Sequence, residues 1–188
     1  MKYCPTCAGN ITFRIPENDD RERHICDACG EIHYQNPRIV VCSLPAYKEQ
    51  VLLCKRAIEP RYGKWTLPGG FMENAETTRD AAIRETREEA CAKIEIHGLY
   101  AYYNLPHINQ VQMFYRATLV DTDFAAGPES LEVELFDEAD IPWNEIAFPA
   151  VGNTLKQYFK DLPEQHFPVR TADIILAEDN RRIIKPIN

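Results

Sequence analysis

Apolar runs long enough to cross a membrane are missing from this sequence of 188 residues, since none approaches the roughly 20 residues that a bilayer requires. The start of the chain carries no apolar export signal, so we expect a cytoplasmic protein with no membrane partner. Positive charge is scarce, with 21 Lys and Arg against 29 Asp and Glu and a net charge of -8. This balance predicts no nucleic-acid partner, because binding along a phosphate backbone needs clustered cations. A small phosphate substrate is compatible with it, since bound divalent cations reverse the local field.

Serine is almost absent as well, and Ser43 and Ser130 alone leave little material for a serine nucleophile. Internal repeats and low-complexity segments are lacking. The remaining composition, 45% apolar and 27% charged, is that of an ordinary globular protein. The chain is long enough for one sizeable core plus a small annex.

The composition changes after Pro37, from a polar segment with paired cysteines to β-rich apolar runs. This change predicts an annex at residues 1–37, a main domain at 38–162 and a C-terminal tail at 163–188. Helices are expected near 77–90 and 150–160. The β-rich segments are 39–44, 51–54, 93–103, 111–119 and 131–136, with two short ones at 174–176 and 182–184 in the tail. The fold class is therefore α+β.

Four of the seven cysteines form two tight pairs, Cys4 with Cys7 and Cys26 with Cys29. Two such pairs give four thiolates for a closed tetrahedral shell, which predicts one structural zinc per chain. The alternative reading is four buried free cysteines. Within residues 1–37 four cations face six anions, a net charge of -2 that does not suit phosphate binding. We therefore interpret this annex as a brace or a dimerisation element.

Three glutamates on the first predicted helix, Glu85, Glu88 and Glu89, share one face at about 100° per residue. A different side, formed by Ala82, Ile83, Thr86 and Ala90, is expected to pack on a sheet. Clustered carboxylates repel one another, whereas hard cations such as Mg²⁺ or Mn²⁺ prefer oxygen ligands and take further ligands from phosphates. The plain alternative is a solvated charged face that pairs with neighbouring arginines.

The pattern around these glutamates resembles the Nudix box of the Nudix hydrolases. It runs from Gly70 through Glu76 to Arg84-Glu85 and Glu88-Glu89, and the preceding residues Gly63 to Gly70 are also typical of that family. The resemblance implies a Nudix α/β/α sandwich with a mixed β-sheet behind a zinc ribbon. It implies Glu85, Glu88 and Glu89 as metal ligands, Glu76 as an accessory ligand and Arg84 as the residue that orients the cluster.

Two positions depart from the box. Thr86 replaces a hydrophobic residue and keeps a methyl group for packing, while Cys91 stands where a glycine is usual. A non-glycine residue with positive φ at Cys91 costs about 1–2 kcal/mol, unless the backbone bends another way. The departures concern local geometry and leave the predicted metal site unchanged.

The segment from Cys29 to Pro37 is typical of zinc-ribbon Nudix proteins, and three further stretches are similar to the plant chloroplast FAD and ADP-ribose pyrophosphatase: Leu53–Arg56, Tyr62–Trp65 and Gly127–Glu132. This likeness implies hydrolysis of FAD to FMN and AMP, or of ADP-ribose to ribose 5-phosphate and AMP, by a homodimer. Pro106 is a weak cue in the same direction. NADH ranks lower, because the Trp-Pro-Phe-Pro signature of NADH pyrophosphatases is missing.

Residues outside the box complete the predicted site. Glu132 is the preferred further carboxylate, either as proton acceptor or as metal ligand, with Glu129 and Glu134 as rivals. Candidates for binding the nucleotide are Arg56, Arg38, Gly70 and Phe71, with Tyr34, Tyr62 and Tyr102 as further stacking candidates. The alternative function is a non-catalytic nucleotide sensor or nucleic-acid-binding protein on the same scaffold, and a decapping-type RNA hydrolase is a third reading.

Overall fold

Residues 1–187 are described by a computed structural model, and their contacts divide them into two units, Met1–Pro37 and a second that starts at Arg38. The first unit is a three-stranded antiparallel sheet in the order β1-β2-β3. Its strands are Ile11–Arg14, Arg23–Cys26 and Ile32–His33. The fully buried apolar side chains in it are Cys4, Ile25 and Cys26. So small a core indicates that the cysteines do more than pack.

The second unit is built on a nine-stranded mixed sheet in the order β10-β5-β4-β9-β8-β11-β12, with β6 paired to β5 and β7 to β4. Strand β4 runs parallel to β9 and β8 parallel to β11, whereas the other pairs are antiparallel. The strands are β4 (Arg38–Tyr47), β5 (Gln50–Arg56), β6 (Trp65–Thr66), β7 (Gly69–Phe71), β8 (Ile94–Leu105), β9 (Gln110–Leu119), β10 (Ser130–Phe136), β11 (Arg170–Leu176) and β12 (Arg182–Pro186).

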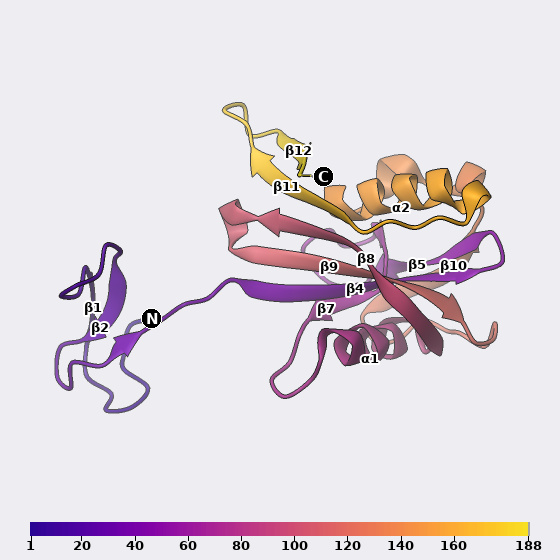
Figure 1. Cartoon of the computed structure of the whole chain (residues 1–188). Helices are drawn as coiled ribbons and strands as arrows, with labels where there is room; N and C mark the ends of the chain where they lie inside the picture. The colour runs from indigo at the N-terminus through magenta and orange to yellow at the C-terminus, as the bar shows by residue number, and fades with distance from the viewer. Residues whose placement is uncertain (188) are drawn as a thin grey trace. The chain divides into compact units, whose positions relative to one another are not determined.

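Helices α1 (Thr78–Ala90) and α2 (Pro149–Asp161) cover opposite faces of this sheet (Figure 1). Alternation along the strands supplies both layers, because Val41 packs with the alanines of α1 and Leu44 packs with α2. Four short 3-10 turns complete the fold, at Pro106–Ile108, Glu138–Asp140, Trp143–Glu145 and Leu162–Glu164. The predicted α/β/α sandwich with a mixed sheet is confirmed, and none of the helices described is long and apolar enough to span a membrane.

Helix α1 begins with Thr77, whose hydroxyl accepts a hydrogen bond from the Asp80 N–H, and ends at Cys91 with φ 51°. The departure at Cys91 is thus a non-glycine residue in the left-handed region. Three of the four predicted stripe residues are buried, whereas Ile83 is 36% exposed and Ala81 and Glu89 are buried in addition. Small alanines on this stripe let the helix approach the sheet closely, and buried Thr86 bonds to Ser43 over 2.6 Å.

The C-terminal residues that the sequence sets apart as a tail form two further strands of the same sheet. Strand β11 pairs in parallel with β8, and β12 pairs with β11. Arg170 anchors β11, since its guanidinium donates to Asp161 at the end of α2, over 2.7 Å from Nη2 to Oδ1. The buried hydroxyl of Tyr100 donates to the same carboxylate over 2.7 Å. The parallel pairing of β11 with β8 joins segments some 70 residues apart, so no local sequence pattern predicts it.

Candidate active site

A cleft of about 720 Å³ opens in the second unit. It lies between the glutamate-bearing face of α1, the start of α2 and the β8–β9 turn. Its wall includes Gly69-Gly70 of β7, Arg56 of β5 and the first residues of α2. Four residues of α1 line it, namely Arg84, Glu85, Glu88 and Glu89. The helical spacing read from the sequence therefore brings the three glutamates into one concave space.

Burial differs strongly among these glutamates. Glu89 is 5% exposed and accepts a hydrogen bond from the Gly69 N–H over 3.1 Å, whereas the side chain of Glu88 is 57% exposed. Burial raises the pKa of Glu89 to about 7, with repulsion from Glu85 adding to the shift. Burial likewise raises the pKa of Glu85, against the opposing effect of Arg84. One buried and one partly buried carboxylate, both with raised pKa values, mark a site that favours additional positive charge.

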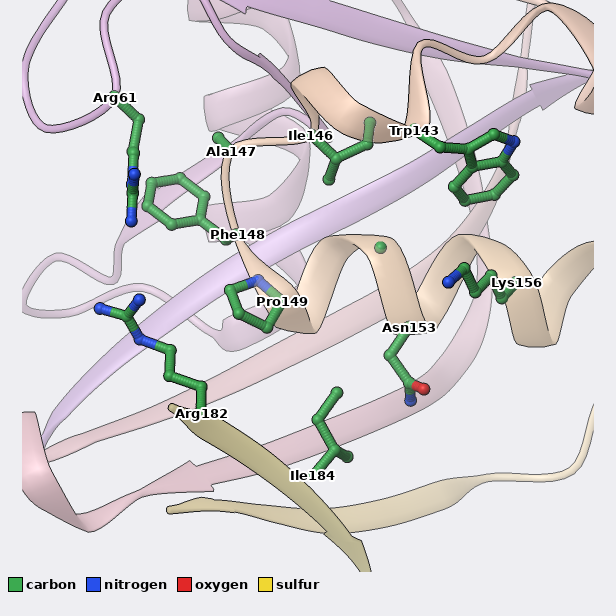
Figure 2. Close-up of a pocket in the computed structure, with 11 residues that line it drawn as sticks. Arg61, Trp143, Ile146, Ala147, Phe148, Pro149, Asn153, Lys156, Arg182 and Ile184 are labelled. Atoms are coloured by element: carbon green, nitrogen blue, oxygen red, sulfur yellow. The ribbon is translucent and has the colours of Figure 1, made fainter. Parts of the chain in front are cut away.

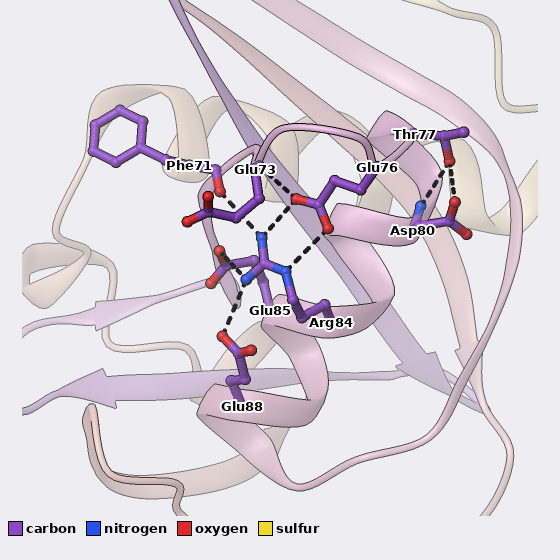
Figure 3. A network of polar contacts seen from close by, with 8 residues as sticks. All are labelled: Phe71, Glu73, Glu76, Thr77, Asp80, Arg84, Glu85 and Glu88. Atoms are coloured by element: carbon purple, nitrogen blue, oxygen red, sulfur yellow. Dashed lines mark hydrogen bonds and ion pairs between the residues drawn. The ribbon is translucent and has the colours of Figure 1, made fainter.

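Arg84 is the hub of the polar network (Figure 3). Its guanidinium binds both oxygens of Glu76, at 2.8 and 3.1 Å, and donates to Glu85 over 2.8 Å and to Glu88 over 3.1 Å. A further bond reaches the Phe71 carbonyl over 3.1 Å. These contacts lower the pKa of Glu76 and raise that of Arg84. Arg84 thus fixes the loop before α1 to the cluster, which is the orienting role that the resemblance implies.

The oxygen donors of this cluster suit a hard divalent cation by chemistry. Arg84 bonds to one oxygen each of Glu85 and Glu88, while Gly69 bonds to one oxygen of Glu89. In the part of the chain that is described, only groups around Cys4 bring three ligand atoms within 4.8 Å of one another, so the three glutamates are more widely spaced. Mg²⁺ keeps several waters in its coordination shell and binds one or two protein carboxylates directly, so it does not need all three glutamate oxygens close together.

Glycines bring the walls of the cleft together. A Cβ on Gly70 would lie 2.6 Å from the carboxylate of Glu85, so only glycine leaves room for that side chain. A Cβ on Gly127 would lie 1.7 Å from the Glu88 carbonyl oxygen. Gly127 instead donates its N–H to the Glu89 carbonyl over 2.9 Å, which ties the segment before β10 to the end of α1. That segment carries Glu129 into the cleft.

Among the three rival carboxylates of this segment, Glu129 alone lines the cleft in the described part of the chain. Glu132 is paired with Lys55 of β5, at 2.7 Å from Nζ to Oε1, and Glu134 is exposed on the same strand. The sequence-based preference for Glu132 therefore has no geometric support. The β10–β5 register, in which Glu132 lies opposite Lys55, directs that side chain into a salt bridge.

Of the predicted nucleotide-binding residues, Arg56, Gly70 and Phe71 line the cleft. Arg38 does not line it, but its guanidinium lies over the Phe71 ring, 4.7 Å from the centroid. The further stacking candidates do not line the cleft: Tyr62 and Tyr102 are not among the described residues that form it, and Tyr34 belongs to the first unit.

Several cleft residues carry no recognisable signal in the sequence. Phe148 lies under the Arg56 guanidinium, 5.2 Å away, and both line the cleft. His107 reaches the cleft from the β8–β9 turn, whose 3-10 helix begins at Pro106, and Gln110 and Gln112 reach it from the start of β9. The Nδ1 of His107 is buried without a hydrogen-bond partner among the described residues. Each of these positions depends on tertiary structure.

The four paired cysteines of the first unit converge, with all four Sγ atoms within 4.8 Å of one another. Cys4 lies 3.9 Å from Cys29 and Cys7 lies 3.4 Å from Cys26. A tetrahedral zinc with bonds of about 2.3 Å to sulfur requires sulfur atoms about 3.8 Å apart. The Cys29 N–H bonds to the Cys26 sulfur and lowers the pKa of that thiol to about 6. The donor set therefore fits a zinc thiolate centre, and the alternative of four buried free cysteines fails because Cys7 and Cys29 are exposed.

We expect undenatured protein to contain one zinc per chain, and the Cys26→Ser variant to lose it together with the ordered structure of residues 1–37. The reason is that so small a core cannot hold this unit without the metal. Elemental analysis and amide-proton dispersion measure the two effects. Cys91→Ser is the matched control, since Cys91 is exposed and outside the cluster, and should retain zinc. A wild-type protein without zinc would contradict the assignment.

The fold and the acidic cleft together define a Nudix-type hydrolase scaffold. A model of the NUDIX domain matches residues 36–158, and a model of the Nudix N-terminal zinc ribbon matches residues 2–35. The chain belongs to the Nudix hydrolases, in the group with an N-terminal zinc ribbon. A NUDIX hydrolase from Nitrosomonas europaea has a similar crystal structure, at 52% identity and a TM-score of 0.88 over 92% of this chain and 99% of that one.

Curated relatives extend the comparison. An ADP-ribose pyrophosphatase from Methanocaldococcus jannaschii is 29% identical over 115 residues, which cover 58% of this chain and 67% of the relative. The NAD-capped RNA hydrolase NudC from Vibrio vulnificus is 30% identical over 146 residues, which cover 76% of this chain and 50% of the relative. The chain thus spans about half the length of this NudC. These relatives are archaeal and bacterial, so the likeness to the plant chloroplast enzyme stays a prediction.

Proposed function

We propose that this protein is a Mg²⁺- or Mn²⁺-dependent hydrolase of a nucleoside diphosphate derivative, with ADP-ribose as the first candidate substrate and FAD as the second. The observation that carries the proposal is the row of Glu85, Glu88 and Glu89 along the cleft, two of them with raised pKa values. The name of the Methanocaldococcus relative supports ADP-ribose over FAD.

The proposed reaction adds one water across the diphosphate bridge. One P–O bond breaks, the water oxygen joins phosphorus, and AMP leaves together with ribose 5-phosphate or FMN. Glu85, Glu88 and Glu89 would hold a divalent cation, which would neutralise phosphate charge and lower the pKa of a water. Glu129 accepts the proton that the attacking water loses, because it is a carboxylate in the same cleft.

The rest of the cleft holds the substrate. Arg56 provides a cation for a phosphate oxygen, and its stacking on Phe148 restrains its guanidinium. The ring of Phe71, 44% exposed and covered on one side by Arg38, offers a surface for a base or flavin ring. Arg84 positions Glu85 and Glu88 and takes no part in the bond changes.

A second candidate is hydrolysis of a dinucleotide cap on RNA. The similarity to NudC over 146 residues favours it, and it is the reason why an RNA substrate stays open despite the net negative charge. Cytoplasmic location and homodimeric assembly are further predictions of the sequence. The non-catalytic alternative has less support, since the cluster of cleft glutamates is complete.

The decisive experiment is a substrate panel of ADP-ribose, FAD, NADH and NAD-capped RNA with product identification. We expect Mg²⁺- or Mn²⁺-dependent release of AMP, with the highest kcat/KM for ADP-ribose and no turnover in excess chelator. A kcat/KM at least tenfold higher for NAD-capped RNA would select the second candidate. No turnover of any substrate, in protein that retains its ribbon zinc and its fold, would favour a non-catalytic role.

A further inference from the structure

A second groove, of about 420 Å³, adjoins the catalytic cleft between α2, the segment before it and β12 (Figure 2). Its lining combines two aromatic rings, Trp143 and Phe148, with three cations. The cations are Arg61 from the loop after β5, Lys156 from α2 and Arg182 from β12. They come from three elements that lie far apart in the sequence.

The groove is positively charged in a protein whose net charge is -8. No carboxylate belongs to its lining. Within the described chain, Arg61, Lys156 and Arg182 form no salt bridge, and the one recorded contact of the Lys156 ammonium is the Trp143 ring, 5.6 Å away. The first turn of α2 also lacks an acidic residue, so the positive end of its dipole is uncompensated. Unpaired cations gathered around one concavity indicate an anionic ligand.

The groove continues from the cleft. Arg61, Phe148, Pro149 and Arg182 line both spaces. In Figure 2 the guanidinium groups of Arg61 and Arg182 both extend to the Phe148 side, whereas Lys156 lies further along α2. From Pro149 to Lys156 the helix rises by roughly 10 Å. An anion at Lys156 therefore lies further from the Phe148 side than the next phosphate of a polyphosphate chain, whereas a ribose between two phosphates spans a distance of this order.

We propose that this groove binds an additional phosphate, one that the substrate carries on its ribose, and that the enzyme accepts ribose-phosphorylated nucleoside diphosphate derivatives. The inference rests on the proposed hydrolase function and specifies its substrate class. Arg61 and Arg182, which also line the cleft, contact the phosphates nearer the cleaved bond, Lys156 contacts the ribose phosphate at the far end of the groove, and the rings of Trp143 and Phe148 flank the sugar.

The test uses a matched substrate pair, ADP-ribose and 2′-phospho-ADP-ribose, which share the same cleaved bond. In the wild type we expect a higher kcat/KM for the phosphorylated member. Lys156→Gln should reduce the ratio of the two kcat/KM values about tenfold, through KM, since one charge-assisted contact is lost. Lys160→Gln, an exposed position four residues further along α2 that lines neither space, is the matched control and should keep the wild-type ratio. An equal kcat/KM for both substrates in the wild type, together with equal binding of the three adenosine phosphates described below, would overturn the inference.

A binding experiment separates this inference from the proposed function. Isothermal titration with AMP, adenosine 2′,5′-bisphosphate and adenosine 3′,5′-bisphosphate needs no turnover and distinguishes the two ribose positions. We expect tighter binding of one bisphosphate than of AMP, lost in Lys156→Gln and kept in Lys160→Gln. If neither ADP-ribose compound is hydrolysed and this pattern holds, the proposed function fails and the groove stands. If ADP-ribose is hydrolysed and all three ligands bind equally, the groove assignment fails alone.

Discussion

Replacing Glu89 with glutamine is expected to abolish hydrolysis and, at the same time, to make the metal-free protein more stable at pH 8. A residue that only supports the fold would behave differently, because its removal lowers activity and stability together. The opposite signs arise from the burial of this carboxylate, 5% exposed at the base of the cleft.

The stability effect follows from proton linkage. The pKa of Glu89 rises from its ordinary 4.5 to about 7 in the folded state. The folded state therefore binds this proton more tightly than the unfolded state. The associated stability is fully present below pH 4.5 and is lost as pH rises through 7. At pH 8 a buried charge costs about 3 kcal/mol, which glutamine avoids while its oxygen still accepts from Gly69. The gain should shrink as the pH is lowered toward 4.5.

The loss of activity follows from the cation that the cluster is proposed to hold. One ionic ligand contributes several kcal/mol to the stabilisation of transition-state charge, so kcat should fall by about a thousandfold or more. Added Mg²⁺ should raise the melting temperature of the wild type and have little effect on Glu89→Gln, since a ligand stabilises only the state that binds it.

Thermal unfolding in chelator at pH 5 and pH 8, together with kcat on ADP-ribose, checks both effects. Glu134→Gln is the control, an identical change at an exposed strand position outside the cleft, and should alter neither quantity. A Glu89→Gln variant with wild-type turnover would remove Glu89 from the metal site. A variant destabilised at pH 8 would show that its carboxylate is a structural partner.

The parts of this structure that the sequence predicts are those with short-range spacing. Cysteine pairs three residues apart and glutamates three and four residues apart are fixed by turn and helix geometry, so their convergence follows from local rules. The strand segments follow from their β-rich composition. Ile83 is the exception on α1, where a large apolar residue is partly exposed because alanines give closer contact with the sheet.

The parts that the sequence does not predict depend on pairing at long range. Residues 170–176 enter the sheet beside β8, and this brings Arg182 of the following strand to the edge of the cleft. Phe148 enters the site because α2 begins immediately after it. The sequence also does not predict which of Glu129, Glu132 and Glu134 faces the cleft. That choice depends on the register of β10 against β5 and not on the order of glutamates along the chain.

That register gives the second large prediction, in which Glu129→Gln lowers kcat on ADP-ribose by about 10²–10⁴-fold, while Glu132→Gln leaves it near the wild-type value. The range is the usual contribution of a general base. Glu129 lines the cleft, and its charge contributes to the raised pKa values of Glu85 and Glu89. Glu132 is engaged by Lys55 at the surface, and an exposed ion pair of this kind contributes at most about 1 kcal/mol to stability.

The two substitutions are chemically identical and three residues apart, so each serves as the control for the other. Circular dichroism and zinc content should be unchanged in both, because neither side chain is buried in the core. If Glu129 acts as the base, its variant should lose kcat with little change in KM or melting temperature, whereas loss of a glutamate that merely holds the loop would change KM and melting temperature as well. Loss of activity in Glu132→Gln with full activity in Glu129→Gln would require the segment before β10 to rearrange when substrate binds. The contacts of Gly127 with the end of α1 argue against such a rearrangement, since a loop held at 2.9 Å to the Glu89 carbonyl keeps Glu129 where it already faces the cleft.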